Sequence, residues 1–144
     1  MKRHLICAAV VACVASHAFA RDTVENYPVA PALVSEPGKV SDDIPLYFAG
    51  QKHPGVVKNY GEFATNKKTN AFGKSDETAC QHVFLSAVIE LQDRARKEGG
   101  NAVINIKSNY KNDLRESATE FTCGAGGVIA GVALVGDVVT IRAK

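Results

Sequence analysis

The chain has 144 residues, of which 46% are hydrophobic, a composition that supports a globular core and argues against a disordered chain. Its formal net charge of +2 comes from Lys2 and Arg3 at the N-terminus, and the rest of the chain balances basic against acidic side chains. A neutral chain lacks the long-range positive field with which proteins collect phosphates, so we expect no nucleic-acid binding.

Residues 1–20 are predicted to be a cleavable secretory signal peptide, which places the mature protein in the periplasm. An apolar run, Leu5–Ala15, follows the two basic residues, and the segment ends in the A-x-A pattern of a cleavage site after Ala20. Crossing a bilayer takes about twenty apolar residues, so we expect no transmembrane segment. The alternative is lipidation of Cys13, because Val10-Val11-Ala12-Cys13 resembles a permissive lipobox. A free Arg21 at the mature N-terminus would exclude the lipid.

The N-terminal part of the mature chain is rich in proline. All five prolines lie between residues 28 and 54, where they disfavour a regular helix or a central strand. We therefore predict an extended, loosely wrapped arm over residues 21–55, with a short edge strand at Ile44–Ala49. A single α+β domain is expected over residues 56–144, and it opens with a strand at Val56–Thr65.

The strongest helix signal covers Asp76–Glu98. Ser75 can cap this segment, acidic residues occupy its first turn and basic residues its last, and Gly99-Gly100 stop it. The apolar residues at helical spacing predict a core face made of Cys80, Phe84, Ala87, Val88, Leu91 and Ala95. Leu85 and Ile89 are apolar but lie outside that face, so a second element must shield their side chains from water. The cover is either the N-terminal arm or a second copy of the chain, which makes this pair a candidate oligomer contact.

Three strands are predicted after the helix. Asn101–Tyr110 and Ser117–Cys123 show alternating patterns, and Gly124–Gly127 is expected to break the ladder. An apolar stretch, Val128–Val135, then leads to a last strand at Val138–Arg142. The predicted fold class is therefore α+β, with one long amphipathic helix packed on a mainly antiparallel sheet of about four strands, and with an extended N-terminal arm.

Cys80 and Cys123 are the cysteines that remain once the signal peptide is removed. In an oxidising compartment an isolated pair usually forms one disulfide. Closing a loop of about 44 residues would contribute roughly 4 kcal/mol in the chain-entropy model. The alternative is a redox or metal-binding pair, but the two residues are far apart in sequence, without C-x-x-C spacing or nearby histidines.

No catalytic or cofactor motif is complete. The glycines of Gly124–Gly131 lack the Lys-Ser/Thr of a P-loop and the later acidic residue of a dinucleotide fold, so they favour a closely packed strand connection. No serine lies in a G-x-S-x-G elbow. His53 and His82 share no local element and make a poor metal site. We expect a protein that is not an enzyme and that holds no metal or cofactor.

The best candidate for a binding surface is the stretch from Lys52 to Lys74. Its five lysines outnumber its single acidic residue, Glu62, and aromatic residues are interleaved with them. Such a surface suits an anionic envelope polymer, lipid head groups or an acidic protein face. The candidate partner-binding residues are Lys52, His53, Lys67 and Lys68. The alternative is a solvated loop whose lysines keep a strand edge from aggregating.

Three short stretches resemble the YbjQ-like and RcsF-like family over about residues 57–142. They are Cys80-Gln81 at the helix start, Gly99-Gly100-Asn101-Ala102-Val103-Ile104 after the helix, and Cys123 followed by Gly136-Asp137-Val138-Val139. The resemblance implies a helix, a hairpin and a closing strand. In the envelope stress-sensor branch the cysteine of Cys-Gln is linked to a cysteine before the last strand, which implies a Cys80–Cys123 disulfide here.

The chain also departs from that family. It lacks the second cysteine pair of the sensor branch and inserts the glycine-rich segment Gly124–Leu134, which argues against a stress-sensing role. The cytoplasmic branch is similar to small homo-oligomers sometimes labelled heavy-metal binding, yet metal ligands are sparse here. Relatives are often labelled as an excinuclease or an ATPase, and without a Walker motif or zinc cysteines that label looks mistaken.

The sequence therefore predicts a non-catalytic, exported binding or interaction module. Its partner would be an envelope protein or an anionic polymer. The alternative is a homo-oligomeric structural protein of the envelope. An envelope stress sensor and a metal-binding protein are less favoured.

Overall fold

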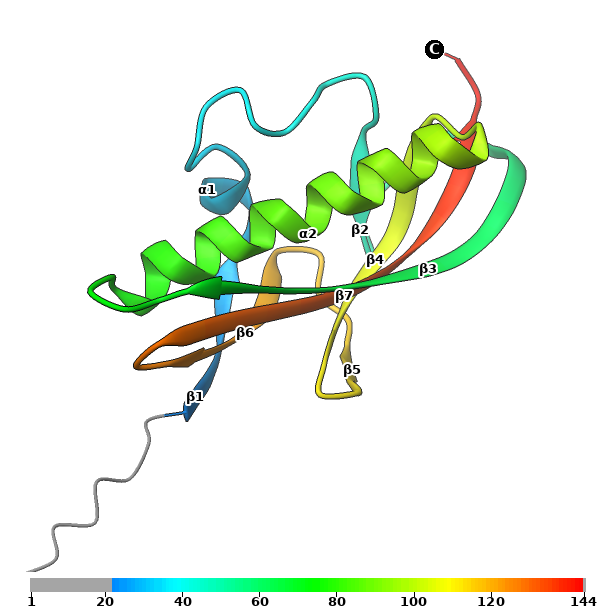
Figure 1. Cartoon of the computed structure of the whole chain (residues 1–144). Coiled ribbons are helices and arrows are strands. Elements are labelled where there is room, and N and C mark those ends of the chain that lie inside the picture. Colours follow the sequence, from blue (N-terminus) through cyan, green and yellow to red (C-terminus); the bar gives the residue numbers. More distant parts are fainter. Residues whose placement is uncertain (1–21, 144) are drawn as a thin grey trace, which may run out of the picture.

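The computed structural model describes residues 22–143, so the predicted signal peptide, its cleavage site and Cys13 lie outside the described residues. The fold is α+β, as predicted (Figure 1). Its elements in chain order are β1 (Asp22–Pro28), α1 (Val29–Leu33), β2 (Leu46–Phe48), β3 (Val56–Asn70), α2 (Asp76–Glu98), β4 (Ala102–Tyr110), β5 (Asp113–Arg115), β6 (Glu120–Gly126) and β7 (Ile129–Ile141).

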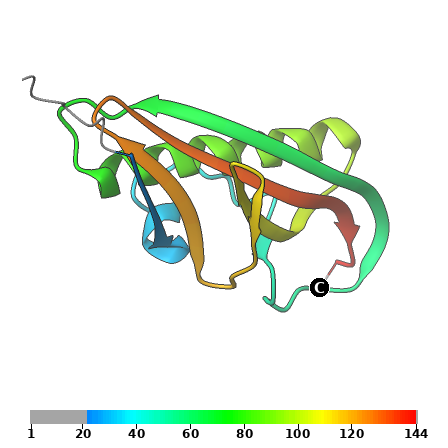
Figure 2. The same cartoon turned by 90° about the horizontal axis from the view of Figure 1, so that it is seen from below.

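The strands form one curled sheet organised around β7. Along one edge β7 pairs antiparallel with β3 over nearly its whole length, from Val56 opposite Ile141 to Asn70 opposite Ile129. Its other edge is shared by β6 near the start and β4 further on, so the sheet forks there (Figure 2). β1 extends the β6 branch, and β2 and β5 pair with β4. Within residues 22–143 the β2–β4 pair is the one parallel pairing.

The expected count of about four strands is wrong, because the sheet has seven. The strands that the sequence did not predict are β1, which comes from the proline-rich arm, and β5, which comes from the turn after β4. The sheet is nevertheless mainly antiparallel.

The arm is more regular than its prolines suggested. Asp22–Pro28 forms β1 at the edge of the sheet, and α1 follows directly, so the prediction of an arm without helix is wrong for residues 22–33. Pro28 ends the strand at the N-cap of α1 and Pro31 lies in its first turn, where a missing N–H costs little. The predicted edge strand at Ile44–Ala49 is confirmed as β2, which is shorter.

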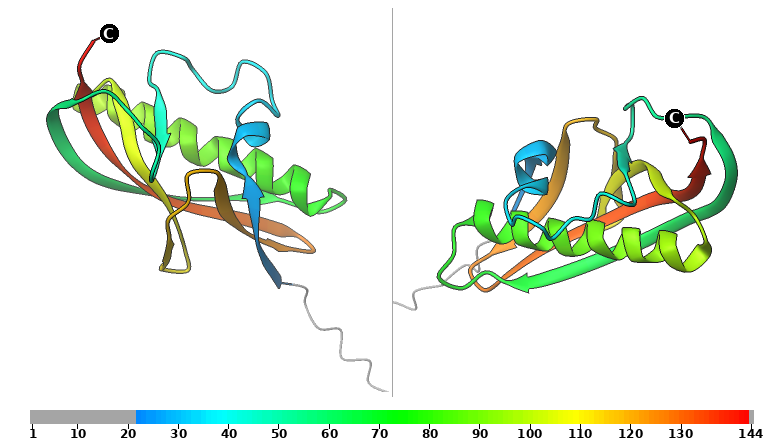
Figure 3. Two further views of the ribbon diagram at one scale, coloured as in Figure 1. Left: turned by 180° about the vertical axis from the view of Figure 1, so that it is seen from behind. Right: turned by 90° about the horizontal axis from the view of Figure 1, so that it is seen from above.

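Helix α2 has the predicted bounds because strong local signals mark both ends. The Ser75 hydroxyl accepts a hydrogen bond from the Thr78 N–H at 3.1 Å, and Gly99 adopts the left-handed conformation with a φ of 86°. The helix lies across one face of the sheet (Figure 3). The six residues of the predicted core face are all buried, namely Cys80, Phe84, Ala87, Val88, Leu91 and Ala95.

The N-terminal arm covers the second apolar side of α2. Leu85 is only 1% exposed and belongs to the same hydrophobic cluster as Val29, Ala32 and Ile44 of the arm. A side chain buried within its own chain is not available to a second copy, so the candidate oligomer contact at Leu85 is wrong. Ile89 is half-buried and packs against the same cluster.

Gln92 of α2 links the arm to the helix through hydrogen bonds. Its side chain is 1% exposed, and its amide donates to the carbonyls of Ser41 at 2.7 Å and Ile44 at 2.8 Å. Its Oε1 also accepts from the Ser41 N–H at 3.3 Å. Nearby, Arg96 hydrogen-bonds to Asp43 at 2.7 Å, and this bond, together with one from Ser41, holds the pKa of Asp43 well below its usual range.

Replacing Gln92 by alanine is expected to lower the free energy of unfolding by about 2 kcal/mol, because it leaves buried backbone groups of the arm without partners. Chemical denaturation measures this change, and faster proteolysis within residues 34–43 would show that the arm is released. Gln81→Ala is the matched control, since Gln81 makes one long hydrogen bond of 3.5 Å to Glu77 on the helix surface. Equal losses in both variants would contradict this role.

The glycine-rich segment continues the ladder instead of breaking it. Gly124 and Ala125 belong to β6 and pair with β1 on one side and with β7 on the other. The apolar stretch and the predicted last strand are one strand, β7, of 13 residues. The expectation of a broken ladder at Gly124–Gly127 is therefore wrong, because a tight β6–β7 hairpin needs only a short turn after Gly126.

Candidate functional site

The structure does not bring the four candidate partner-binding residues together. Lys52 and His53 lie in the loop before β3, where the Gly55 carbonyl accepts a hydrogen bond from the Arg142 N–H beyond the end of β7. Lys67 and Lys68 lie near the other end of the 15-residue strand β3, at the opposite end of the molecule (Figure 2). These residues therefore cannot form one binding patch.

The environments of these residues also differ. Lys67 forms an ion pair with Glu90 of α2, on the helix side of the sheet. Lys68 is its neighbour on a strand, so its side chain projects from the opposite face. The His53 ring lies 5.7 Å from the ring of Tyr47.

The stretch expected to be a solvated loop is an edge strand. Residues 66–70 extend β3, which pairs with β7 on one side and with no other strand of the described part of the chain. Lys58, Lys67 and Lys68 lie along this open edge. Lysines on an edge strand oppose edge-to-edge aggregation, so the structure favours that role for them.

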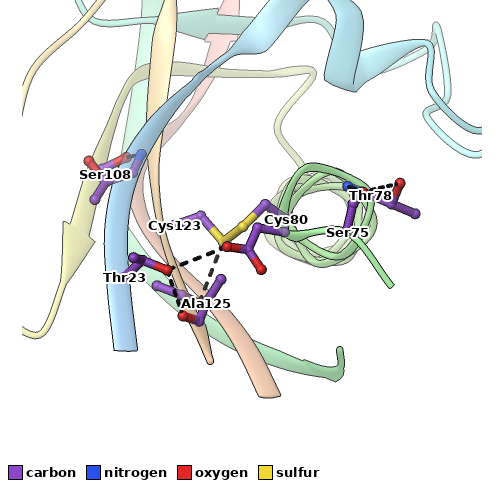
Figure 4. Close-up of a disulfide and its surroundings, with 10 residues drawn as sticks. Thr23, Ser75, Thr78, Cys80, Ser108, Cys123 and Ala125 are labelled. Atoms are coloured by element: carbon purple, nitrogen blue, oxygen red, sulfur yellow. Dashed lines mark hydrogen bonds between the residues drawn. A yellow bond between two sulfur atoms is a disulfide. The ribbon is translucent and has the colours of Figure 1, made fainter. Parts of the chain in front are cut away.

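Cys80 and Cys123 form the predicted disulfide, which ties α2 to β6 (Figure 4). Their Cα atoms are 5.9 Å apart, and both side chains are fully buried. Thr23 of β1 lies beside the bond and donates a hydrogen bond to the Ala125 carbonyl at 3.0 Å. With both sulfurs bonded to each other and excluded from solvent, this pair is a structural cross-link.

A groove opens on the face of the sheet that points away from α2, and we call it the glycine groove. It has a volume of about 350 Å³. Its walls carry Tyr110, Lys68 and Ile129, and Asp22 lies at its rim. Its floor is formed by Gly124, Gly126, Gly127 and Gly131.

The glycines of the floor make room for an aromatic ring. A Cβ atom placed on Gly124 would overlap the ring of Tyr110, and one on Gly131 would lie 3.4 Å from the same ring. Tyr110 therefore packs flat on backbone. The sequence favours a closely packed connection at these glycines. The ring of Tyr110 explains why glycine is needed there, because a side chain at Gly124 would occupy the space of the ring.

A closed ion pair lies at the mouth of the glycine groove. The Lys111 ammonium donates a hydrogen bond to the Asp22 carboxylate at 3.1 Å, and this bond raises the pKa of Lys111. The same ammonium lies 5.5 Å from the centre of the Tyr110 ring. The charge of Asp22 is thus balanced locally.

Three exposed apolar residues lie at the end of the molecule that bears the groove, and we call Phe72, Val128 and Ile129 the apolar tip. They are 74%, 61% and 54% exposed. Val128 and Ile129 line the groove. Phe72 lies on the β3–α2 turn, Val128 lies on the β6–β7 turn, and Ile129 begins β7. The two turns are joined by a hydrogen bond of 2.6 Å from the Ala71 N–H to the Val128 carbonyl. The two turns lie together at one end of the molecule (Figure 3). Sequence reasoning missed this cluster, because only the β3–β7 register brings the turns together.

A second cleft, of about 440 Å³, lies in the fork between β4 and β6. Its lining is polar, with Ser108, Thr122 and Asn26 among its residues. The Thr122 N–H donates to the Ser108 hydroxyl at 2.9 Å, and the Thr122 hydroxyl donates to the Asn26 side chain at 2.8 Å. These three groups satisfy one another's hydrogen bonds.

Metal-ligating side chains do not gather within residues 22–143, where no three His, Cys, Asp or Glu residues approach one another as a metal site would require. His82 instead pairs with Glu36 at 2.7 Å, and the Nδ1 of His53 lies 2.8 Å from the Pro54 carbonyl. In the same part of the chain, no helix has both the length and the apolar character needed to cross a membrane.

A scan against protein-family models found no matching family, and a search of the curated proteins found no match. The resemblance to the YbjQ-like and RcsF-like family therefore stays a prediction.

Proposed function

We propose that this protein is a non-catalytic, exported binding module of the cell envelope, and that it engages its partner through the apolar tip and the adjoining glycine groove. The exposed apolar tip is the observation that carries the proposal. Folded proteins rarely expose large apolar side chains side by side, and where they do, the patch is usually an interaction site. Phe72 supplies the aromatic anchor that binding surfaces favour.

The distribution of the other exposed apolar side chains supports a binding site at the end of the molecule that bears the apolar tip. Three other apolar side chains are at least as exposed as Ile129: Val34 at 71% after α1, Val57 at 65% at the start of β3, and Leu114 at 54% in β5. Scattered residues of this kind are ordinary on protein surfaces. The lack of an assembled catalytic set among the sequence motifs supports a binding role over a catalytic one.

Site-specific photo-crosslinking in the cell envelope tests the proposal. With a benzoylphenylalanine in place of Ile129, we expect adducts with an envelope component, because this side chain would contact the partner. The same group in place of Val57 is the matched control, since Val57 is similarly exposed at the far end of β3. Mass spectrometry identifies the adduct as protein or lipid. Equal crosslinking at both positions, or none at Ile129, would overturn the proposal.

A further inference from the structure

We infer that the occupant of the apolar tip is the surface of a phospholipid bilayer, into which Phe72, Val128 and Ile129 insert. This inference rests on the proposed function and names its partner. Position is the first argument. The β3–α2 turn, the β6–β7 turn and the start of β7 lie at one end of the molecule (Figure 1), so Phe72, Val128 and Ile129 lie at its extremity. A bilayer can meet such an extremity without providing a matching cavity, whereas a protein partner would need to provide one.

Charge is the second argument. Lys68 adjoins Val128 and Ile129 in the groove wall, and Lys74 follows Phe72 in the same turn, where its N–H donates to the Ala71 carbonyl at 3.1 Å. Both lysines are exposed. Apolar side chains flanked by lysines suit the interface of an anionic bilayer, because the apolar groups enter it while the ammonium groups meet the phosphates.

The carboxylates at this end of the molecule are partly offset. Asp22 is paired with Lys111. Asp76 and Glu77 lie in the first turn of α2, where the positive end of the helix dipole offsets part of their negative charge. The Thr23 hydroxyl also lies 3.4 Å from the Asp76 carboxylate.

Vesicle binding tests the inference on a chain that begins at Arg21, so that neither the apolar run nor Cys13 contributes. This chain is the predicted mature protein, and it contains every residue of the described core and the disulfide. We expect it to sediment with vesicles of phosphatidylethanolamine and phosphatidylglycerol, and less with phosphatidylcholine alone. The triple variant F72S/V128S/I129S is expected to bind at least about tenfold more weakly, because three apolar side chains no longer leave water. The double variant V34S/V57S is the matched control and should bind like the unmodified chain.

Fluorescence gives a second readout that does not depend on the triple variant being folded. The chain contains no tryptophan, so Phe72→Trp introduces a single reporter at the apolar tip, and its emission is expected to shift to the blue when vesicles are added. Val57→Trp should show no shift. Absence of vesicle binding, equal binding by the triple variant, or equal shifts at both positions would overturn the inference. A protein adduct at Ile129 without vesicle binding would leave the proposed function intact and overturn only the lipid partner.

Discussion

Replacing Cys80 and Cys123 together by alanine is expected to lower the free energy of unfolding by about 4 kcal/mol. The bond joins residues 43 positions apart, so breaking it returns a large amount of conformational freedom to the unfolded chain. It also links the first turns of α2 to β6, two elements that the chain connects only through β4 and β5. Chemical denaturation of the two proteins measures the difference.

Reduction of the unmodified protein provides the control for this prediction. In the presence of a thiol reductant its stability should fall to that of the double alanine variant, and the variant itself should not respond. A loss below about 1 kcal/mol would contradict the prediction, because removing a native disulfide from a small secreted domain typically costs about 2 to 5 kcal/mol.

Phe84→Ala is expected to lower the free energy of unfolding by about 3 to 5 kcal/mol. Phe84 is fully buried on α2 and stacks on Phe121 of β6 with ring centroids 4.1 Å apart. Its ring also lies 6.0 Å from that of Phe48 in β2. Truncating the side chain leaves a cavity where the helix, the sheet and the arm meet, and the surrounding elements cannot close it without moving the disulfide.

Phe72→Ala is the matched control for that substitution. It removes the same side chain from a position that is 74% exposed, so we expect stability to stay within about 0.5 kcal/mol of the unmodified protein. Thermal or chemical denaturation distinguishes the two variants. Similar losses in both would show that Phe84 does not hold the layers together, or that Phe72 is buried by its own chain.

The sequence was most informative where local chemistry decides the structure. Ser75 caps α2 and Gly99 ends it through interactions within one turn, so both ends of the helix could be read from neighbouring residues. The spacing of the apolar residues likewise predicted its buried face, because that face depends only on the period of a helix. The cysteine pair was predictable from its isolation in a chain expected to be exported.

The prediction failed where pairing between distant strands decides the structure. The prolines argued against regular structure in the arm. β1 forms nevertheless, because it pairs with β6, which lies about a hundred residues later in the chain. The sequence offered two covers for Leu85, the N-terminal arm and a second copy of the chain, and the structure shows that the arm provides it. Gly124 looked like the end of a strand, although it lies inside one and leaves space for the ring of Tyr110.

By itself the sequence determined the class of the fold, the extent and buried face of α2, and the Cys80–Cys123 cross-link, since each follows from local spacing or from the small number of cysteines. The proposed binding surface could be recognised only from the tertiary structure. The register that sets Asn70 opposite Ile129 brings the turn that carries Phe72 beside the turn that carries Val128, and the length of β3 separates Lys52 from Lys67. Residues that are close in a sequence are held apart by an extended strand, and residues far apart become neighbours where two strands pair.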